Sequence, residues 1–200
     1  FSNNLEHINK SLEKSNICFL HAPLFHLSLK NISPIRSELA VKTFFNMLGP
    51  MVNPLQPKSQ LIGVFNKKIF QLYSNIYKKS DKNYCIVHSL DGYDEVSLTS
   101  PFKLYSNKYD STFTSKDLNL SNTLSKNLEG GNNIKDSAKI FINILKNESS
   151  KEQLNVVLAN AGIAIYCSQR LNSINEGISF AKESIESGNA YRCFKSFISK

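Results

Sequence analysis

The chain has 200 residues, 41% of them hydrophobic, which is enough to bury the core of one domain. No apolar run reaches the ~18 residues that a membrane-spanning helix needs, so we exclude a membrane protein. The formal net charge is +8, but only three residues are arginines (Arg36, Arg170 and Arg192) and the lysines are scattered, which argues against nucleic-acid binding. The excess charge is either a solvated surface or a feature that serves an anionic ligand.

Cys18, Cys85, Cys167 and Cys193 are widely spaced and form no Cys-x-x-Cys pair. Each lies in or beside an apolar run. This pattern favours reduced core cysteines in a cytoplasmic protein over a disulfide framework or a metal site. The sequence has no secretory signal and opens on Phe1 rather than Met, so we expect further residues upstream.

The first predicted elements are an amphipathic helix over residues 4–15 and a short buried strand, Ile17–Leu20. The strand leads into a loop that carries His21 and His26. In open α/β sheets, ligands bind at the carboxyl ends of the strands, so His26 is either a functional residue or a packed loop residue.

The segment Lys30–Pro54 holds the most unusual pattern. Ser33 and Pro34 are a strong helix start, and Arg36 follows in the first turn, where the helix dipole disfavours a cation. Arg36 therefore either grips an anionic ligand, such as a carboxylate, through two parallel hydrogen bonds, or it forms a salt bridge. Gly49 is placed to end the helix, and the prolines from Pro50 onward predict a stiff loop without helical structure.

A strand at 61–65, a helix at 67–79 and a strand at 84–88 form a predicted βαβ unit with parallel pairing. The loop after the second strand carries Asp91, Asp94 and Glu95. The carboxylates of Asp94 and Glu95 suit Mg²⁺, which takes a few carboxylates together with water and phosphate oxygens. Asp and Gly are also ordinary turn residues, so a plain turn is the alternative.

Residues 101–114 alternate like a β-hairpin, and 118–128 predict an irregular segment. Gly130 and Gly131 indicate a turn before a helix. The remainder predicts four helices, at 134–147, 151–170, 173–187 and 189–198. The second of these has an almost wholly apolar middle, VVLANAGIAIYC, and is expected to be the central core helix.

Three segments taken together resemble one family. FLHAPLFHLSLKNISPIRSELAVKTFFNMLGPMVNPLQPKSQLIGV is similar to the central segment of the anthranilate phosphoribosyltransferases, and DGYDEVS resembles the metal loop of that family. The Gly-Gly-Asn turn, the Leu-Ala-Asn-Ala helix and the tail EGISFAKESIESGNA match its C-terminal half in order. The resemblance covers essentially the whole chain.

The resemblance implies a reaction and a set of site residues. Arg36 would meet the carboxylate of anthranilate, with His26, Gly49 and Pro50 lining the channel for that substrate. Asp94 and Glu95 would hold Mg²⁺, expected as two ions, against the diphosphate of phosphoribosyl pyrophosphate. The product would be N-(5-phosphoribosyl)anthranilate, in tryptophan biosynthesis, formed by positioning of the two substrates with no catalytic nucleophile.

The resemblance also implies a fold and a limit. The expected fold is an α/β domain over residues 1–200, with a central, mostly parallel sheet flanked by helices and incomplete at its N-terminal side, where an exposed sheet edge is expected. The glycine-rich diphosphate loop and the N-terminal helical domain of the family are absent from these residues. We therefore expect the chain alone to have little activity, and the full-length enzyme to be a homodimer. The alternatives are a relative of the pyrimidine nucleoside phosphorylases and a non-catalytic remnant.

Overall fold

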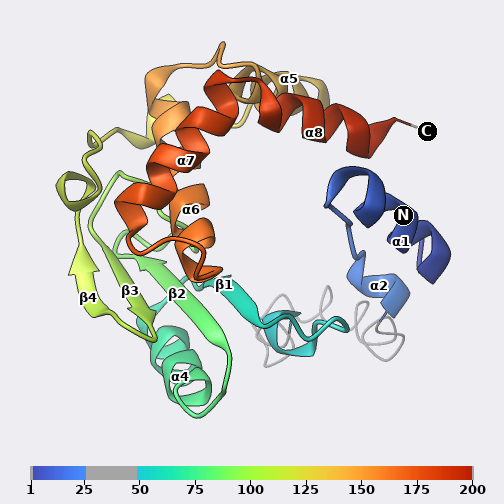
Figure 1. Cartoon of the computed structure of the whole chain (residues 1–200). Helices are drawn as coiled ribbons and strands as arrows, with labels where there is room; N and C mark the ends of the chain where they lie inside the picture. The colour runs from blue at the N-terminus through green and yellow to red at the C-terminus, as the bar shows by residue number, and fades with distance from the viewer. Residues whose placement is uncertain (1, 26–48, 200) are drawn as a thin grey trace. The chain divides into compact units, whose positions relative to one another are not determined.

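The computed structural model describes residues 2–25 and 49–199, which divide between two compact units (Figure 1). The first unit takes the described residues up to Gln56 together with those from Arg192 onward, and the second is Pro57–Tyr191. The helix predicted at 33–48, with Arg36 in its first turn, lies outside the described residues, and so does His26.

The first unit contains helix α1 (Leu5–Ser15), the short helices α2 (Ala22–Phe25) and η2 (Gly49–Val52), and the end of helix α8 (Asn189–Ile198). The Asn4 side chain caps α1 by accepting hydrogen bonds from two main-chain N–H groups of its first turn, which confirms the predicted start. The end of α8 lies beside the end of α1, because the Cys193 thiol donates to the Ser15 carbonyl at 3.1 Å.

The buried strand predicted at Ile17–Leu20 is wrong, and so is the loop predicted after it. No strand forms there, Phe19 is 57% exposed, and residues 22–25 are the helix α2. The carbonyl of Ile17 accepts a hydrogen bond from the Ser11 hydroxyl at 2.8 Å instead of joining a sheet ladder. An apolar run of four residues has no periodicity to identify it as a strand.

The second unit is built on a sheet with the order β1-β2-β3-β4. β1 (Ser59–Gly63) and β2 (Asn83–Ser89) are parallel and joined by helix α4 (Lys67–Tyr77), so the predicted βαβ unit is confirmed. β3 (Phe102–Ser106) and β4 (Asp110–Phe113) form the predicted hairpin, and β3 pairs antiparallel with β2. The α/β fold is as expected, but the described sheet is mixed, with one parallel pairing among three.

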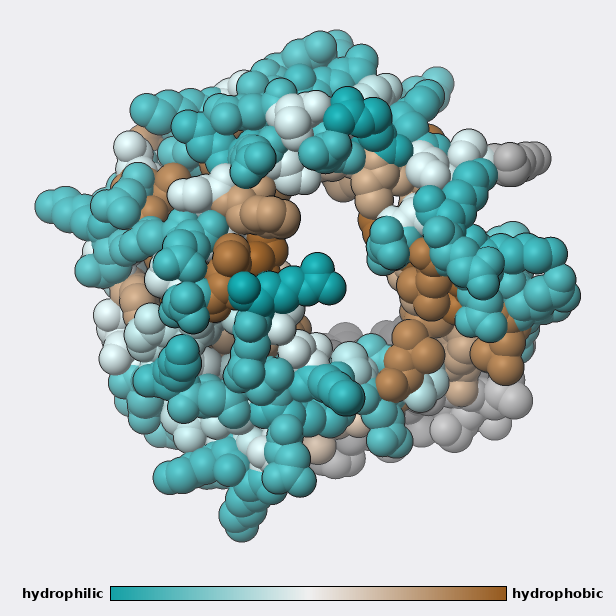
Figure 2. Space-filling view, viewed as in Figure 1, coloured by the Kyte–Doolittle hydropathy of each residue, from teal (hydrophilic) through white to brown (hydrophobic). Residues whose placement is uncertain are grey.

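Strand β2 is buried on both faces and separates two layers of helices. On one face, Tyr84 and His88 contact α4, with ring centroids 5.7 Å from Tyr77 and 6.3 Å from Phe70 respectively. On the other face, Cys85 and Val87 join the main hydrophobic core, to which helices α6 (Lys151–Cys167) and α7 (Ile174–Glu186) contribute. Hydrophilic side chains, teal in Figure 2, lie over the region of α4, but this helix also exposes Leu72 (41%) and Ile76 (37%).

The helical part begins with two single turns, η3 (Ser115–Leu118) and η4 (Ser125–Leu128). Only η4 lies within the segment predicted to be irregular, and η3 ends where that segment begins. Helix α5 (Ile134–Leu145) follows the Gly130-Gly131 turn, and α6 and α7 begin where the sequence predicts. α6 and α7 cross at glycines: a Cβ on Gly162 would lie 2.8 Å from the Ile178 nitrogen, and one on Gly177 would overlap the Gly162 carbonyl. Within the described ranges, no helix is long and apolar enough to span a bilayer.

Candidate functional site

The acidic loop, Leu90–Glu95, follows directly after β2. Because β1 and β2 are parallel, their carboxyl ends meet at one edge of the sheet, and the loop lies at this edge. The side chains of Asp91, Asp94 and Glu95 are exposed there. This is the position at which the sequence predicts a ligand site.

A compact turn sets the shape of the loop. The Ser89 N–H donates to the Tyr93 carbonyl at 3.1 Å, and the Gly92 N–H donates to the Ser89 carbonyl at 2.9 Å. Gly92 has φ +99°, a conformation that glycine adopts without strain. The Ser89 hydroxyl donates to the Glu95 carbonyl at 2.6 Å, which ties the end of the loop to its start.

The loop also rests on the end of β1. A Cβ built on Gly63, the last residue of that strand, would overlap the main-chain carbonyl of Asp94. No side chain fits between the strand end and the loop. Gly63 therefore allows the main chain of Asp94 to lie directly against β1.

Asn160 of helix α6 holds the loop from the other side. Its carbonyl oxygen accepts from the Val96 N–H at 3.0 Å, and its amide donates to the Val96 carbonyl at 2.8 Å. Val96, the residue after Glu95, is fully buried. Sequence reasoning did not identify Asn160 as part of the site, although an amide inside an apolar helix was a usable signal, since a buried polar side chain needs partners.

The three carboxylates differ in what engages them. The Thr99 hydroxyl donates to the Asp91 carboxylate, so Asp91 serves the loop's own structure. Within the described part of the chain, no hydrogen bond or ion pair engages the side chains of Asp94 and Glu95. These two adjacent carboxylates are the ones left to bind a ligand.

The donor set of Asp94 and Glu95 fits Mg²⁺ held jointly with a phosphorylated ligand. Carboxylate oxygens are hard ligands, and Mg²⁺ is commonly bound by one or two carboxylates plus substrate phosphates and water. Among the described residues, no cluster of three or more His, Cys, Asp or Glu side chains could hold a metal alone. The site suits a cation that arrives with its substrate rather than a closed metal cage.

The residues predicted to bind anthranilate are not brought together in the described structure. Arg36 and His26 lie outside it, while Gly49 and Pro50 open the single turn η2. The sequence predicts a loop without helical structure from Pro50 onward. The structure corrects this prediction at the start of the loop, because Gly49–Val52 form a turn of 3-10 helix. Pro50 is compatible with such a turn, because its fixed φ suits the first turn of a helix.

A family model described as "Glycosyl transferase family, a/b domain" matches residues 2–191. This chain belongs to that family. An anthranilate phosphoribosyltransferase of Christiangramia forsetii is 50% identical to this glycosyl transferase domain over 195 residues, which cover 98% of the chain and 59% of that enzyme. One from Cytophaga hutchinsonii is 47% identical, with 98% and 60% covered. The chain therefore spans less than two thirds of these relatives, and the resemblance inferred from the sequence is confirmed.

Solved structures agree with the fold. The anthranilate phosphoribosyltransferase of Thermus thermophilus superposes with a TM-score of 0.86 at 27% identity, over 95% of this chain and 57% of that one. The enzyme from Saccharomyces cerevisiae, in complex with PRPP and Mg, gives 0.87 at 24% identity over 96% and 55%. At 24% sequence identity, the comparison with the Saccharomyces cerevisiae enzyme shows only that the two proteins share a fold.

Proposed function

We propose that this glycosyl transferase domain is the C-terminal part of an anthranilate phosphoribosyltransferase. The observation that carries the proposal is the acidic loop, which presents Asp94 and Glu95 unengaged at the carboxyl edge of the parallel strands. The 50% identity to the Christiangramia forsetii enzyme supports it. The reaction would transfer the phosphoribosyl group from PRPP to anthranilate, giving N-(5-phosphoribosyl)anthranilate and pyrophosphate, a step of tryptophan biosynthesis.

The site residues divide between the two substrates. Asp94 and Glu95 would hold Mg²⁺, as two ions, against the diphosphate of PRPP. Arg36 would grip the carboxylate of anthranilate, with His26, Gly49 and Pro50 lining the path to it. A guanidinium is suited to this task because it forms two parallel hydrogen bonds with a carboxylate.

The proposed reaction requires the chain to position the two substrates and does not require a nucleophilic residue. The amine nitrogen of anthranilate forms a bond to C1 of the ribose, the bond from C1 to the pyrophosphate oxygen breaks, and the amine loses a proton. Bound Mg²⁺ would neutralise the charge that develops on the leaving pyrophosphate. Gly63, Ser89 and Asn160 fix the main chain of the acidic loop, so that the loop needs no rearrangement to present its two carboxylates.

We expect these residues alone to be inactive, since they contain no glycine-rich loop to bind the diphosphate. The full-length enzyme would be a homodimer. All four cysteines are free thiols, which accords with a cytoplasmic location.

A chimera tests the function. The chain would replace the aligned 195 residues of the Christiangramia forsetii enzyme, and the loss of anthranilate fluorescence would be followed with PRPP and Mg²⁺. We expect activity in the chimera and none in the chain alone. Asp94→Asn and Glu95→Gln should raise the Mg²⁺ concentration needed for half-maximal rate, and Arg36→Ala should raise the KM for anthranilate. Exposed Arg170→Ala is the matched control.

Two outcomes would contradict the proposal. An inactive chimera that folds and dimerises like its parent would favour a non-catalytic remnant. Phosphorolysis of uridine or thymidine by the chimera would instead favour a pyrimidine nucleoside phosphorylase.

A further inference from the structure

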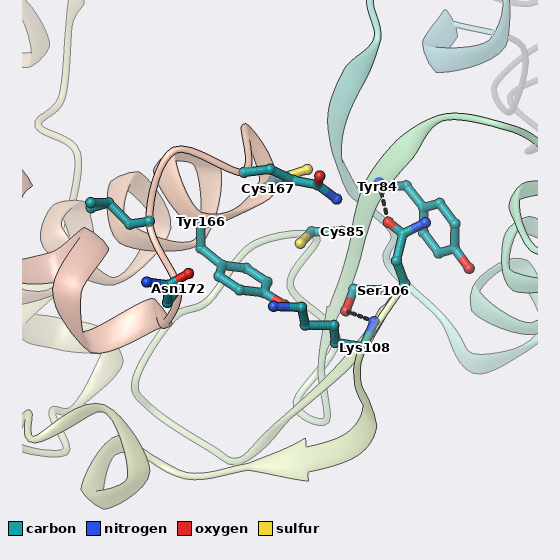
Figure 3. Close-up of a pocket in the computed structure, with 10 residues that line it drawn as sticks. Tyr84, Cys85, Ser106, Lys108, Tyr166, Cys167 and Asn172 are labelled. Carbon is teal, nitrogen blue, oxygen red and sulfur yellow. Dashed lines mark hydrogen bonds between the residues drawn. The ribbon is translucent and has the colours of Figure 1, made fainter.

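A pocket lies at the start of β2, at the opposite end of this strand from the acidic loop. Figure 3 shows the side chains that line it. It has a volume of about 230 Å³ and is bordered by the start of β2, the turn between β3 and β4, and the end of α6. Cys85 and Cys167 line it together with polar side chains, among them Ser106, Lys108 and Asn172. Nothing in the proposed transfer reaction uses these residues.

The two cysteine thiols lie at the same pocket. Cys85 comes from β2 and Cys167 is the last residue of α6, and Figure 3 shows their sulfur atoms near each other. The Cys167 thiol in turn donates to the Gln60 carbonyl at 3.3 Å. The fold therefore brings two nucleophilic atoms to one pocket, although 82 positions (167 minus 85) separate them in the sequence.

The closeness of the two thiols makes them chemically unequal. The neighbouring Cys85 stabilises a thiolate at Cys167 and lowers the pKa of Cys167, although burial opposes the shift. The neighbouring Cys167, together with burial, raises the pKa of Cys85. Since the thiolate is the reactive form, Cys167 is the nucleophile of the pair and Cys85 the proton donor.

We propose that Cys85 and Cys167 form an oxidisable dithiol site, at which a hydroperoxide that enters the pocket converts the two thiols into an intramolecular disulfide. The site is independent of the proposed transferase function and would persist if that function were wrong.

The oxidation proceeds in two steps. The Cys167 sulfur attacks the hydroperoxide, the O–O bond breaks, and a sulfenic acid forms as the alcohol, or water, leaves. The Cys85 sulfur then attacks the Cys167 sulfur, the S–O bond breaks, and water leaves with the proton of Cys85. The cysteines lose two electrons in total and the hydroperoxide gains them.

The pocket selects for a small polar oxidant. Cys85 is 0% and Cys167 4% exposed, so the pocket is the approach that the structure offers to their sulfur atoms. Its volume of about 230 Å³ admits hydrogen peroxide, which is little larger than a water molecule of ~30 Å³, or a small alkyl hydroperoxide. Ser106 and Asn172 offer polar contacts on the way in, and a bulky disulfide such as oxidised glutathione would not fit.

The test uses the full chain with Cys18→Ser and Cys193→Ser, which leaves only the pair as thiols. The folded chain is treated with hydrogen peroxide, its remaining thiols are blocked with N-ethylmaleimide, and the intact mass and the peptides are measured. We expect loss of both blocked thiols, a peptide linked between Cys85 and Cys167, and recovery of both thiols with dithiothreitol. The reaction should be slower in urea, where the two thiols separate.

Two further variants assign the roles. In the same background, Cys85→Ala should give a sulfenic acid at Cys167 that dimedone traps, whereas Cys167→Ala should give neither a disulfide nor trapped sulfenic acid at Cys85. A chain that keeps its circular dichroism spectrum and forms no Cys85–Cys167 linkage, or links only between molecules, would overturn the proposal. Equal trapping of the two single thiols would overturn the assignment of Cys167 as the nucleophile.

Discussion

At the scale of single residues, Asn160 fixes the residue that follows the acidic loop. Its amide satisfies both main-chain groups of buried Val96, one as donor and one as acceptor. Replacement by a nonpolar residue of similar size would leave both groups without their partners. A buried polar group that loses its hydrogen bond costs about 1–3 kcal/mol.

We therefore predict that Asn160→Leu lowers the free energy of unfolding by about 2 kcal/mol. Urea denaturation measures this change, and hydrogen exchange of the Leu90–Val96 amides should speed up more than exchange in β3. Ala164→Leu, on the exposed side of the same helix, is the control and should change little. Equal effects of the two variants would show that the hydrogen bonds of Asn160 do not hold the loop.

Gly63 leads to a second prediction at this scale. A methyl group there would overlap the Asp94 carbonyl, so Gly63→Ala must push the loop away from β1. Overpacking of this kind costs about 1–3 kcal/mol. In the chimera, the variant should also raise the Mg²⁺ requirement, because the displaced loop carries Asp94. Gly130→Ala is the control, since no atom lies within 4 Å of its added Cβ; a normal Mg²⁺ requirement in Gly63→Ala would count against the role given to this contact.

The sequence allowed part of this site to be predicted. Asp94 and Glu95 could be found because they are neighbours in a loop that follows a strand, and both features are local. Val96, which hydrogen-bonds with Asn160, lies 64 positions away in the sequence. A single sequence gives no means of pairing residues so far apart. Gly63 was likewise assigned to a strand, with no indication of the loop that covers it.

At the scale of elements, the crossing of α6 and α7 depends on glycine. Gly162 and Gly177 let the two helix backbones approach closely, and a Cβ on Gly177 would overlap the Gly162 carbonyl. We predict that Gly177→Ala lowers the free energy of unfolding by about 1–3 kcal/mol, despite the better helix propensity of alanine. Urea denaturation with Gly130→Ala as reference tests this, and an increase in stability would contradict the close contact.

Helix α4 contributes a prediction on pH. Burial, with repulsion from Tyr77, raises the pKa of Tyr73 to about 12. The ordinary tyrosine pKa is about 10, so the unfolded chain releases this proton first. The stability linked to Tyr73 is therefore fully present below about pH 10 and is lost as the pH rises through about 12.

Tyr73→Phe removes the titrating group. At alkaline pH, this variant should therefore lose about 2 kcal/mol less free energy of unfolding than the parent. The measurement is the free energy of unfolding in urea at several values between about pH 8 and about pH 12. Burial raises the pKa of Tyr84 to about 12 as well, so some alkaline loss should remain in the variant. An unchanged profile would show that Tyr73 does not contribute.

Elements with a long, clear period were predictable, and short ones were not. α1, α4 and the four C-terminal helices appear where their caps and apolar spacing place them. Residues 17–20 were misassigned because four apolar residues fit a strand, a buried turn or an exposed connector equally well. β1 was predicted two residues late, at 61–65 instead of Ser59–Gly63, since Leu61 is the first strongly apolar residue of a strand that starts on Ser59.

At the scale of the whole molecule, the comparison with the Christiangramia forsetii enzyme aligns 98% of this chain with only 59% of that enzyme. The acidic loop is present in full, while the diphosphate would need further donors from a glycine-rich loop. The expected inactivity of these residues alone is thus a prediction about substrate binding rather than about stability. The second unit has its own sheet, core and helix layers, and should remain folded when no activity is found.

The contacts that fasten the acidic loop at Gly63, Ser89 and Asn160 are all made by uncharged groups. Salt screens interactions between exposed charges but has little effect on buried neutral hydrogen bonds. The affinity of the loop for a cation and the conformation of the loop should therefore respond separately to ionic strength. High salt would weaken cation binding while the hydrogen bonds that hold the loop remain formed. Dilution of the salt would then restore binding without a refolding step.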